Sequence, residues 1–294
     1  MKIYDCTTFY SEKMMLDLRF NILNENVHKF IVVESSFSHS GKKKKFNFEI
    51  NDYPKFKDKI IYLKINEEPI NIFKDSDGLI SPYKKRLNSI KRIEQSYDYM
   101  MRGISDAKDE DLIIISDNDE IPNLESYKFK NSKKNFIIFK QLLFYYKFNL
   151  HHDLLPWFGS KACKKKYLKS FSNLRNLKNK KYPFWRLDTY LSDIKETSVE
   201  IINEGGWHFT NIKTPEDLYI KMKNFGHHDE FDDSKLTIED LRKNIDNGIV
   251  FYDHFADKTS INKWQNDYKL KKIDNHLLPN YLVQNLDNYK KWFK

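Results

Sequence analysis

Two acidic residues directly after an apolar segment are the strongest chemical signal in the sequence. Asp117 and Asp119 follow the Leu-Ile-Ile-Ile run at 112–115, and Pro122 closes the segment. This run predicts a buried strand that ends at the proline. Residues two positions apart on an extended backbone point to the same face. Two carboxylates at the carboxyl end of a buried strand repel each other unless a cation lies between them, so we expect Mg²⁺ or Mn²⁺ there with a diphosphate.

The acidic residues need not share one role. We expect Asp119 to contact the metal directly, whereas Asp117 is a second ligand or binds the ribose or a metal-bound water. Glu120 either orients these groups or is a solvated turn carboxylate. A solvated acidic turn is the alternative for the whole segment, because Asp-x-Asp by itself is a weak signal.

The elements that position these residues form an alternating pattern in the first half of the chain. Apolar residues at helical spacing predict helices at 12–24 and 83–104. Predicted strands lie at 2–5, 30–34, 59–63 and 111–116. This alternation predicts an α/β fold with a mostly parallel central sheet, flanking helices and a ligand edge at the strands' carboxyl ends.

The second half of the chain is more mixed. Strands are expected at 135–140 and 142–148, and the segment from 164 to 167 reads as a basic, mobile stretch. Thr214 and Thr237 have the pattern of helix N-caps, and Gly248 that of a C-cap.

Composition limits the class of protein. The 294 residues fit one large α/β domain or two small ones, and 40% hydrophobic with 32% charged residues exclude a disordered chain. The sequence lacks an apolar run of membrane-spanning length and, at its start, a signal-peptide core. Cys6 and Cys163 have neither metal-site nor disulfide-framework spacing, so we expect a cytoplasmic protein.

The chain is strongly basic, with a net charge of +9. Its lysines are spread along the chain, without zinc-finger spacing or an aromatic RNA-binding motif, so we do not expect nucleic acid as a partner. The charge is better explained by phosphate-bearing substrates or by peripheral contact with an anionic inner membrane face.

Six short segments, in order, extend over nearly the whole chain. They are Ile-Tyr-Asp-Cys at 3–6 with Leu18 and Arg19; Phe-Ile-Val-Val-Glu-Ser at 30–35 with Ser38, Gly41 and Lys44; 116–122; Gly-Gly-Trp-His-Phe-Thr at 205–210; 225–230; and 278–282 with Asn285. Together they resemble glycosyltransferase family 17, the bisecting β-1,4-N-acetylglucosaminyltransferase-like family. Members of that family usually carry an arginine in the helix before the acidic motif. Here Tyr97 stands there, with Arg92 and Arg102 nearby.

The resemblance implies a GT-A-like fold, a nucleotide-sugar donor, a divalent metal and inversion at the anomeric carbon. UDP-N-acetylglucosamine is the family's best-known donor. We therefore expect a hexosyltransferase in one domain over 1–294, with 1–125 binding the nucleotide sugar and 126–294 facing a glycan or glycolipid acceptor.

Three further groups of residues are candidates for the site. His208 is a third metal ligand or a hydrogen-bonded core histidine, and Trp207 stacks on a sugar or base or belongs to the core. An inverting transfer needs a general base, for which Glu230 is the first choice, ahead of Asp229 and His228. The doubled His227-His228 leaves two registers open: His227 with Asp229, or His228 with Glu230.

Residues near the first two strands are candidates for holding the donor. Arg19 could grip the diphosphate or pair with Glu12 or Glu34 as a structural bridge. Glu34 lies at the same edge. Lys44 and its neighbours at 42–45 approach the donor phosphates or form a solvated basic loop.

Two other functions remain open. A metal-dependent nucleotidyl or phosphoryl transferase would also use an aspartate pair after a strand, but its usual glycine-rich loop near the N-terminus is absent from the sequence. A non-enzymatic, basic nucleic-acid-binding protein is the other alternative.

Overall fold

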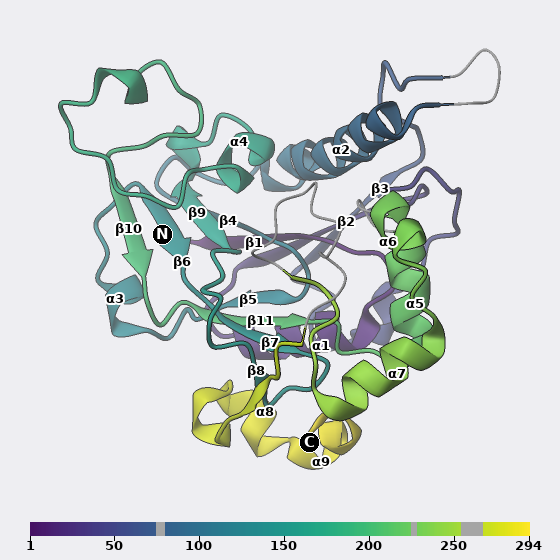
Figure 1. Ribbon diagram of the computed structural model, residues 1–294. Coiled ribbons are helices and arrows are strands. Elements are labelled where there is room, and N and C mark those ends of the chain that lie inside the picture. The colour runs from purple at the N-terminus through teal and green to yellow at the C-terminus, as the bar shows by residue number, and fades with distance from the viewer. Residues whose placement is uncertain (75–79, 225–227, 254–266) are drawn as a thin grey trace.

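The chain folds into a mixed α/β structure with two β-sheets and helices packed around them (Figure 1). The computed structural model describes residues 1–74, 80–224, 228–253 and 267–294, and only the backbone at 228–230. Within these ranges no helix is both long and apolar enough to cross a membrane. The expected α/β class is confirmed.

The larger sheet has seven strands in the order β10-β6-β9-β4-β1-β2-β3. All run in one direction except β9, which is antiparallel to both its neighbours. The sheet is therefore mostly parallel, as expected. Its strands are β1 (Ile3–Thr8), β2 (Lys29–Ser35), β3 (Ile60–Ile65), β4 (Leu112–Ser116), β6 (Phe136–Phe139), β9 (Lys161–Lys164) and β10 (Val199–Ile202).

The smaller sheet has the order β12-β8-β7-β11-β5. Its strand β5 follows β4 after a short turn, so the acidic residues lie where the two sheets meet. Strand β11 pairs with β5 antiparallel and with β7 parallel, which brings residues near 208 beside that turn. The strands are β5 (Glu120–Pro122), β7 (Leu142–Tyr145), β8 (Leu150–His151), β11 (Gly206–Thr210) and β12 (Lys271–Lys272).

Apolar side chains of β4 divide between the two faces of the larger sheet. Leu112 and Ile114 pack into one hydrophobic cluster, and Ile113 and Ile115 into another. This is the alternation that an extended strand requires. Because β4 is buried on both faces, its sequence is continuously apolar.

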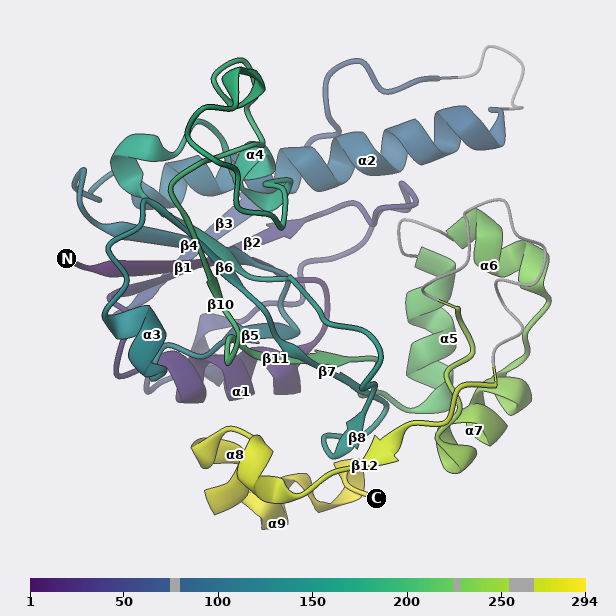
Figure 2. The ribbon, with the colours of Figure 1, turned by 60° about the vertical axis from the view of Figure 1, so that its left-hand side comes forward.

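Helices cover both faces of the larger sheet. Figure 2 shows α2 and α4 on one side and α1, with α8 and α9 below it, on the other. Helices α5 and α7 pack with the smaller sheet in a third hydrophobic cluster. The α-helices are α1 (Lys13–Leu23), α2 (Pro82–Asp98), α3 (Tyr127–Lys130), α4 (Phe171–Arg175), α5 (Pro215–Asn224), α6 (His228–Ser234), α7 (Ile238–Asn247), α8 (Asn280–Gln284) and α9 (Leu286–Tyr289). The 3₁₀ helices are η1 (Ile50–Asp52), η2 (Tyr99–Ile104), η3 (Lys165–Tyr167), η4 (Leu187–Thr189), η6 (Asn275–Leu277) and η7 (Lys290–Trp292).

The predicted helix ends are confirmed, but one predicted loop is wrong. Thr237 forms a capping box with Asp240, and Gly248 ends α7 at a φ of 67°. The stretch at 164–167 is ordered: Lys164 ends β9, and η3 follows it. Lys164 and Lys166 both form ion pairs with Glu110. These pairs hold in place a segment whose run of positive charge suggested a mobile stretch.

Candidate active site

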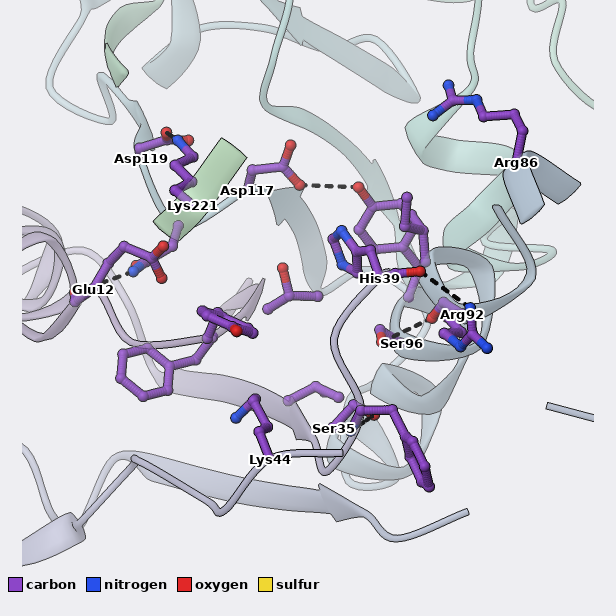
Figure 3. Close-up of a pocket in the computed structure, with 18 residues that line it drawn as sticks. Glu12, Ser35, His39, Lys44, Arg86, Arg92, Ser96, Asp117, Asp119 and Lys221 are labelled. Atoms are coloured by element: carbon purple, nitrogen blue, oxygen red, sulfur yellow. Dashed lines mark hydrogen bonds and ion pairs between the residues drawn. The ribbon is translucent and has the colours of Figure 1, made fainter. Parts of the chain in front are cut away.

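A cavity of about 350 Å³ opens at the carboxyl ends of β1, β2 and β4 (Figure 3). Glu12, Asp119 and Lys221 lie together at one end of it, and Arg86 and Arg92 of helix α2 lie at the other. In sheets with parallel strands this edge is where ligands bind. The ligand edge expected from the sequence is therefore a cavity with both acidic and cationic walls.

The acidic residues lie on a turn and not on an extended strand. The chain turns at Asn118 and Asp119, and the amide of Glu120 donates to the carbonyl of Asp117 at 3.0 Å. The premise that Asp117 and Asp119 share one face of a strand is wrong for this reason. Both residues line the cavity, but each carboxylate has its own set of partners.

Arg175, the last residue of α4, joins Asp117 to Glu120. One guanidinium nitrogen lies 2.7 Å from Asp117 Oδ2 and 2.9 Å from Glu120 Oε1, and the other lies 2.6 Å from Glu120 Oε2. Tyr97 donates to the second oxygen of Asp117 at 2.9 Å. Both oxygens of Asp117 thus have protein partners, so a metal ion or a ribose would compete with Arg175 and Tyr97 for them.

These contacts shift the pKa values of the two carboxyls in opposite directions. Burial raises the pKa of Asp117, and repulsion from Glu120 adds to this against the attraction of Arg175. Burial would also raise the pKa of Glu120, but the charge and hydrogen bonds of Arg175 outweigh it and hold that pKa below its usual range. Glu120 is fully buried and also accepts from Trp157 Nε1 at 2.8 Å. It is therefore an ionised group that fixes the turn.

Asp119 has a different environment. Its Oδ1 lies 3.4 Å from Nε2 of His208 on β11, and its Oδ2 lies 3.8 Å from Nζ of Lys221 on α5. Burial would raise the pKa of Asp119, but His208 and Lys221 outweigh that effect and hold it well below its usual range. Asp119 is therefore ionised and lines the cavity beside a histidine, and the role of both residues as metal ligands stays a prediction.

Two glycines allow β11 to come this close to the acidic turn. A Cβ on Gly206, whose φ is 116°, would lie 2.2 Å from the carbonyl oxygen of Ile121, and a Cβ on Gly205 would meet the backbone of Lys140. Only glycine fits at such positions. The Gly-Gly pair before Trp207 and His208 thus positions the histidine.

The residues at Asp119 are suited to a divalent cation. Oδ1 of Asp119 and Nε2 of His208 are close enough to be neighbouring ligands of one ion. Nδ1 of His208 is buried and has no hydrogen-bond partner among the described residues. Among the described side chains, no three His, Cys, Asp or Glu residues converge as a metal-binding group. A cation here would therefore take its other ligands from a bound ligand's oxygens and from water, as Mg²⁺ commonly does.

Arg19 is completely buried beneath the turn. It donates to Asp5 through two nitrogens, at 2.7 and 2.5 Å, and to the carbonyl of Glu120 at 2.6 Å. It does not line the cavity. Its partner is Asp5 and not Glu12 or Glu34, so in this structure Arg19 supports the acidic turn from the side away from the cavity.

Glu34 and Lys44 organise the loop after β2. Glu34 is buried, pairs with Lys44, and accepts hydrogen bonds from the amides of Asn47 and Phe48 at 2.8 and 3.0 Å and from the hydroxyl of Tyr62 at 2.7 Å. Of the two, Lys44 lines the cavity. Lys44 could thus reach a ligand, whereas Glu34 holds the loop that presents it.

Cationic side chains also line the far end of the cavity. Arg92 donates to Glu68 at 2.7 Å and to the carbonyl of His39 at 3.1 Å. Burial lowers the pKa of His39 to about 4 against the opposing charge of Glu12, so the imidazole is neutral at pH 7. With Arg86 and Lys44, this end of the cavity is suited to an anionic group.

Trp207 and the predicted bases lie elsewhere or outside the described side chains. Trp207 donates to the carbonyl of Leu277 at 2.7 Å and packs with the core. His227 lies outside the described residues. The backbone of 228–230 begins helix α6, which packs on α5, but the side chains of His228, Asp229 and Glu230 lie outside the description. Their roles stay predictions.

Sequence reasoning missed Arg175 and Trp157. Arg175 is 58 residues from Asp117 in sequence, and no motif surrounds it. The ring of Trp157 packs against that of His208, with centroids 4.4 Å apart and planes tilted by 35°, and its Nε1 donates to Glu120. Gly159 lies against the same carboxylate, because a Cβ there would lie 2.4 Å from Glu120 Cδ.

One of three comparisons with known proteins, that with protein families, agrees with the sequence resemblance. The family model of glycosyltransferase family 17 matches residues 1–293. No curated protein matches the sequence. Among solved structures, HddC from Yersinia pseudotuberculosis, complexed with GMP-PN, is 14% identical with a TM-score of 0.36, over 75% of this chain and 97% of that one. A candidate glucose-1-phosphate thymidylyltransferase from Bacillus anthracis, in complex with a sucrose, is 11% identical with a TM-score of 0.30, over 70% of this chain and 87% of that one.

Proposed function

The chain belongs to glycosyltransferase family 17, and we propose that it is an inverting, metal-dependent enzyme that transfers a sugar from a nucleoside diphosphate donor to a glycan or glycolipid. Membership of this family supports glycosyltransferase activity. The donor, which we take to be UDP-N-acetylglucosamine, and the GT-A-like character of the fold are part of the proposal. The observation that carries it is the ionised Asp119, which lies beside His208 and lines a cavity that four cationic side chains also line.

The charges of the cavity support a diphosphate donor. Lys221 lies next to Asp119, and Lys44, Arg86 and Arg92 also line the cavity. A diphosphate held near Asp119 needs cations on its other side, because a carboxylate alone would repel it. We propose that Lys221 contacts the donor phosphates and that the arginines of α2 hold the far end of the donor.

Asp119 and His208 would hold the divalent cation. When bound, such a cation neutralises the charge that develops on the leaving diphosphate. The protein's own part is to keep Asp119 ionised and His208 oriented. Trp157 helps to orient His208 by packing against its imidazole. Arg175 and Arg19 hold the turn that presents Asp119.

The acceptor hydroxyl must lose a proton as the new bond forms. We keep Glu230 as the general base, with Asp229 and His228 as the alternatives, because α6 begins at 228 and packs on the helix that carries Lys221 into the cavity. Losing a general base typically lowers the rate by ~10²–10⁴-fold.

Lys221 also favours one alternative, in which the enzyme transfers sugar without a metal. An ammonium group 3.8 Å from Asp119 could itself neutralise the leaving phosphate. Chelation distinguishes the two mechanisms, because activity that depends on Lys221 alone would survive it.

A screen of donor turnover tests the proposal. The purified protein is incubated with UDP, GDP, CMP and dTDP sugars, with Mn²⁺ or with a chelator, and release of the nucleotide is measured. We expect turnover of a UDP sugar that needs the metal and is lost in Asp119→Asn. Asp287→Asn, at an exposed position on α9, is the matched control and should be fully active. Turnover of no sugar nucleotide, or full activity of Asp119→Asn, would refute the proposal.

A further inference from the structure

The segment between α4 and β10, residues 178–195, has an unusual surface. Five of the sixteen exposed large apolar side chains in the described residues lie within eight consecutive positions of it, and they are 67–94% exposed. They are Phe184, Trp185, Leu187, Tyr190 and Leu191. We name residues 178–195 the aromatic loop. Both Figures 1 and 2 show it projecting from the body, on the side opposite the C-terminal helices α8 and α9. An exposed apolar cluster of this density marks an interaction surface.

The aromatic loop is an ordered structure. The amide of Lys178 donates to the carbonyl of Ile194 at 2.8 Å, which closes its base. Inside it, Asp188 forms ion pairs with Arg186 at 2.7 Å and Lys195 at 2.8 Å, and the buried Thr189 hydroxyl donates to the carbonyl of Arg186 at 2.6 Å. These contacts hold the backbone of the aromatic loop in place while its apolar side chains stay exposed.

Cations surround the apolar cluster. The aromatic loop contains three lysines at its start, Arg186 in the middle and Lys195 at its end, against two carboxylates, Asp188 and Asp193. Its net charge is therefore +3. The three lysines, Lys178, Lys180 and Lys181, are all exposed.

We propose that the aromatic loop binds an anionic membrane surface. Tryptophan, tyrosine and phenylalanine are favoured at the boundary between lipid headgroups and acyl chains, where an apolar ring meets a polar edge. Exposed lysines beside such a cluster reach the anionic headgroups, and each adds to the affinity. A second copy of the chain would also cover an apolar patch, but two loops of charge +3 would repel each other. The membrane therefore explains both the apolar cluster and its charge.

Vesicle co-sedimentation tests this proposal independently of sugar transfer. The vesicles are phosphatidylcholine alone or an equal mixture with phosphatidylglycerol. We expect the protein to sediment with the mixture and much less with phosphatidylcholine. The triple variant Phe184→Ser, Trp185→Ser, Leu191→Ser should bind the mixture at least tenfold more weakly. Its control, Tyr127→Ser with Leu154→Ser, removes exposed apolar side chains elsewhere and should bind normally.

A second loop variant, which changes only charge, keeps the proposal testable if the triple apolar variant does not fold. Lys178→Ser with Lys180→Ser should weaken binding to the mixture roughly fivefold for each charge. Lys272→Ser with Lys290→Ser removes two exposed lysines at the opposite end of the molecule and should not.

Three outcomes would overturn the proposal. The first is equal sedimentation of the protein with both kinds of vesicle, and the second is unchanged binding to the mixture by both loop variants. The third is an absence of vesicle binding in a protein that forms a dimer, where the triple variant is a monomer. The last would assign the aromatic loop to contact between copies. Donor turnover in solution should be the same in all four variants, so failure of lipid binding and failure of the proposed transfer are separate results.

Discussion

Replacing Arg175 with methionine should destabilise the protein by about 3–5 kcal/mol at neutral pH, because it leaves a buried carboxylate without its cation. The cost comes mainly from Glu120, whose side chain is 0% exposed, and less from Asp117, which is 39% exposed and can be hydrated. Glu120 would keep only its hydrogen bonds from Trp157 and from the amide of Asp117. Methionine fills most of the arginine's volume, so a cavity adds little.

The deficit should shrink as the pH falls. In the wild type, Arg175 holds the pKa of Glu120 below its usual value near 4.5, so the stability from this group is present above that pH and is lost as the pH falls through the folded pKa. Without Arg175, burial leaves the pKa of Glu120 raised. The folded variant then takes up a proton more readily than the unfolded chain and regains stability as the pH falls from 7 towards about 4.5.

Urea unfolding at a series of pH values measures this effect. Adding Glu120→Gln to Arg175→Met should restore part of the lost stability, because the buried charge is gone. Arg242→Met, whose partner Glu216 is exposed, is the matched control and should unfold like the wild type. A loss below about 1 kcal/mol, the value of an exposed ion pair, would refute the reasoning. So would a deficit that stays constant with pH.

Three other predictions follow from the structure. The buried Lys161, whose amine donates to the carbonyls of Arg175 and Leu177, has its pKa lowered to about 7 by burial. Above that pH the amine is therefore protonated in the unfolded chain but largely neutral in the folded protein, so the free energy of unfolding rises with pH. In urea unfolding, the wild type should gain stability relative to Lys161→Met from pH 7 to about pH 9. Gly206→Ala should lower the thermal midpoint and weaken Mn²⁺ binding in calorimetry, because its Cβ would meet the carbonyl of Ile121; unchanged values for both would contradict the role of this glycine. In turnover assays Glu230→Gln should lose ~10²–10⁴-fold in rate, whereas a dead Asp229→Asn with a normal Glu230→Gln would select the other register.

The elements of the first half of the chain could be predicted because local signals determine them. Strand β4 is a run of mostly β-branched residues, and α1 and α2 have apolar residues at helical spacing; β4 and α1 lie where they were predicted. The helix predicted at 83–104 is α2 as far as Asp98, and its last part, Tyr99–Ile104, is the 3₁₀ helix η2. Strand β9 could not be found in this way. Its Lys-Ala-Cys-Lys sequence has no strand pattern, and it becomes a strand because β4 and β6 hydrogen-bond to it from both sides.

Residues of the candidate site could be named from the sequence only where each belongs to a short motif. Asp119 and His208 each belong to a short motif, and both lie where a cation could bind. Arg175 has no motif, and its place depends on the path of β9 and α4, which sequence spacing does not reveal. The partners of Asp117 were missed for the same reason: the turn at Asn118 directs Asp117 towards Arg175, and that turn depends on the pairing of β5 with β11.

Calorimetric titration of UDP-N-acetylglucosamine into the protein, with and without Mn²⁺, tests the central claim most directly. The claim is that Asp119 and His208 hold a cation that binds the donor diphosphate. The wild type should bind the donor at least tenfold more tightly with Mn²⁺ than without it. Asp119→Asn and His208→Ala should lose this metal dependence, while Glu230→Gln keeps it. Donor binding that is the same with and without Mn²⁺ in the wild type, or a metal dependence that survives in both Asp119→Asn and His208→Ala, would contradict the account.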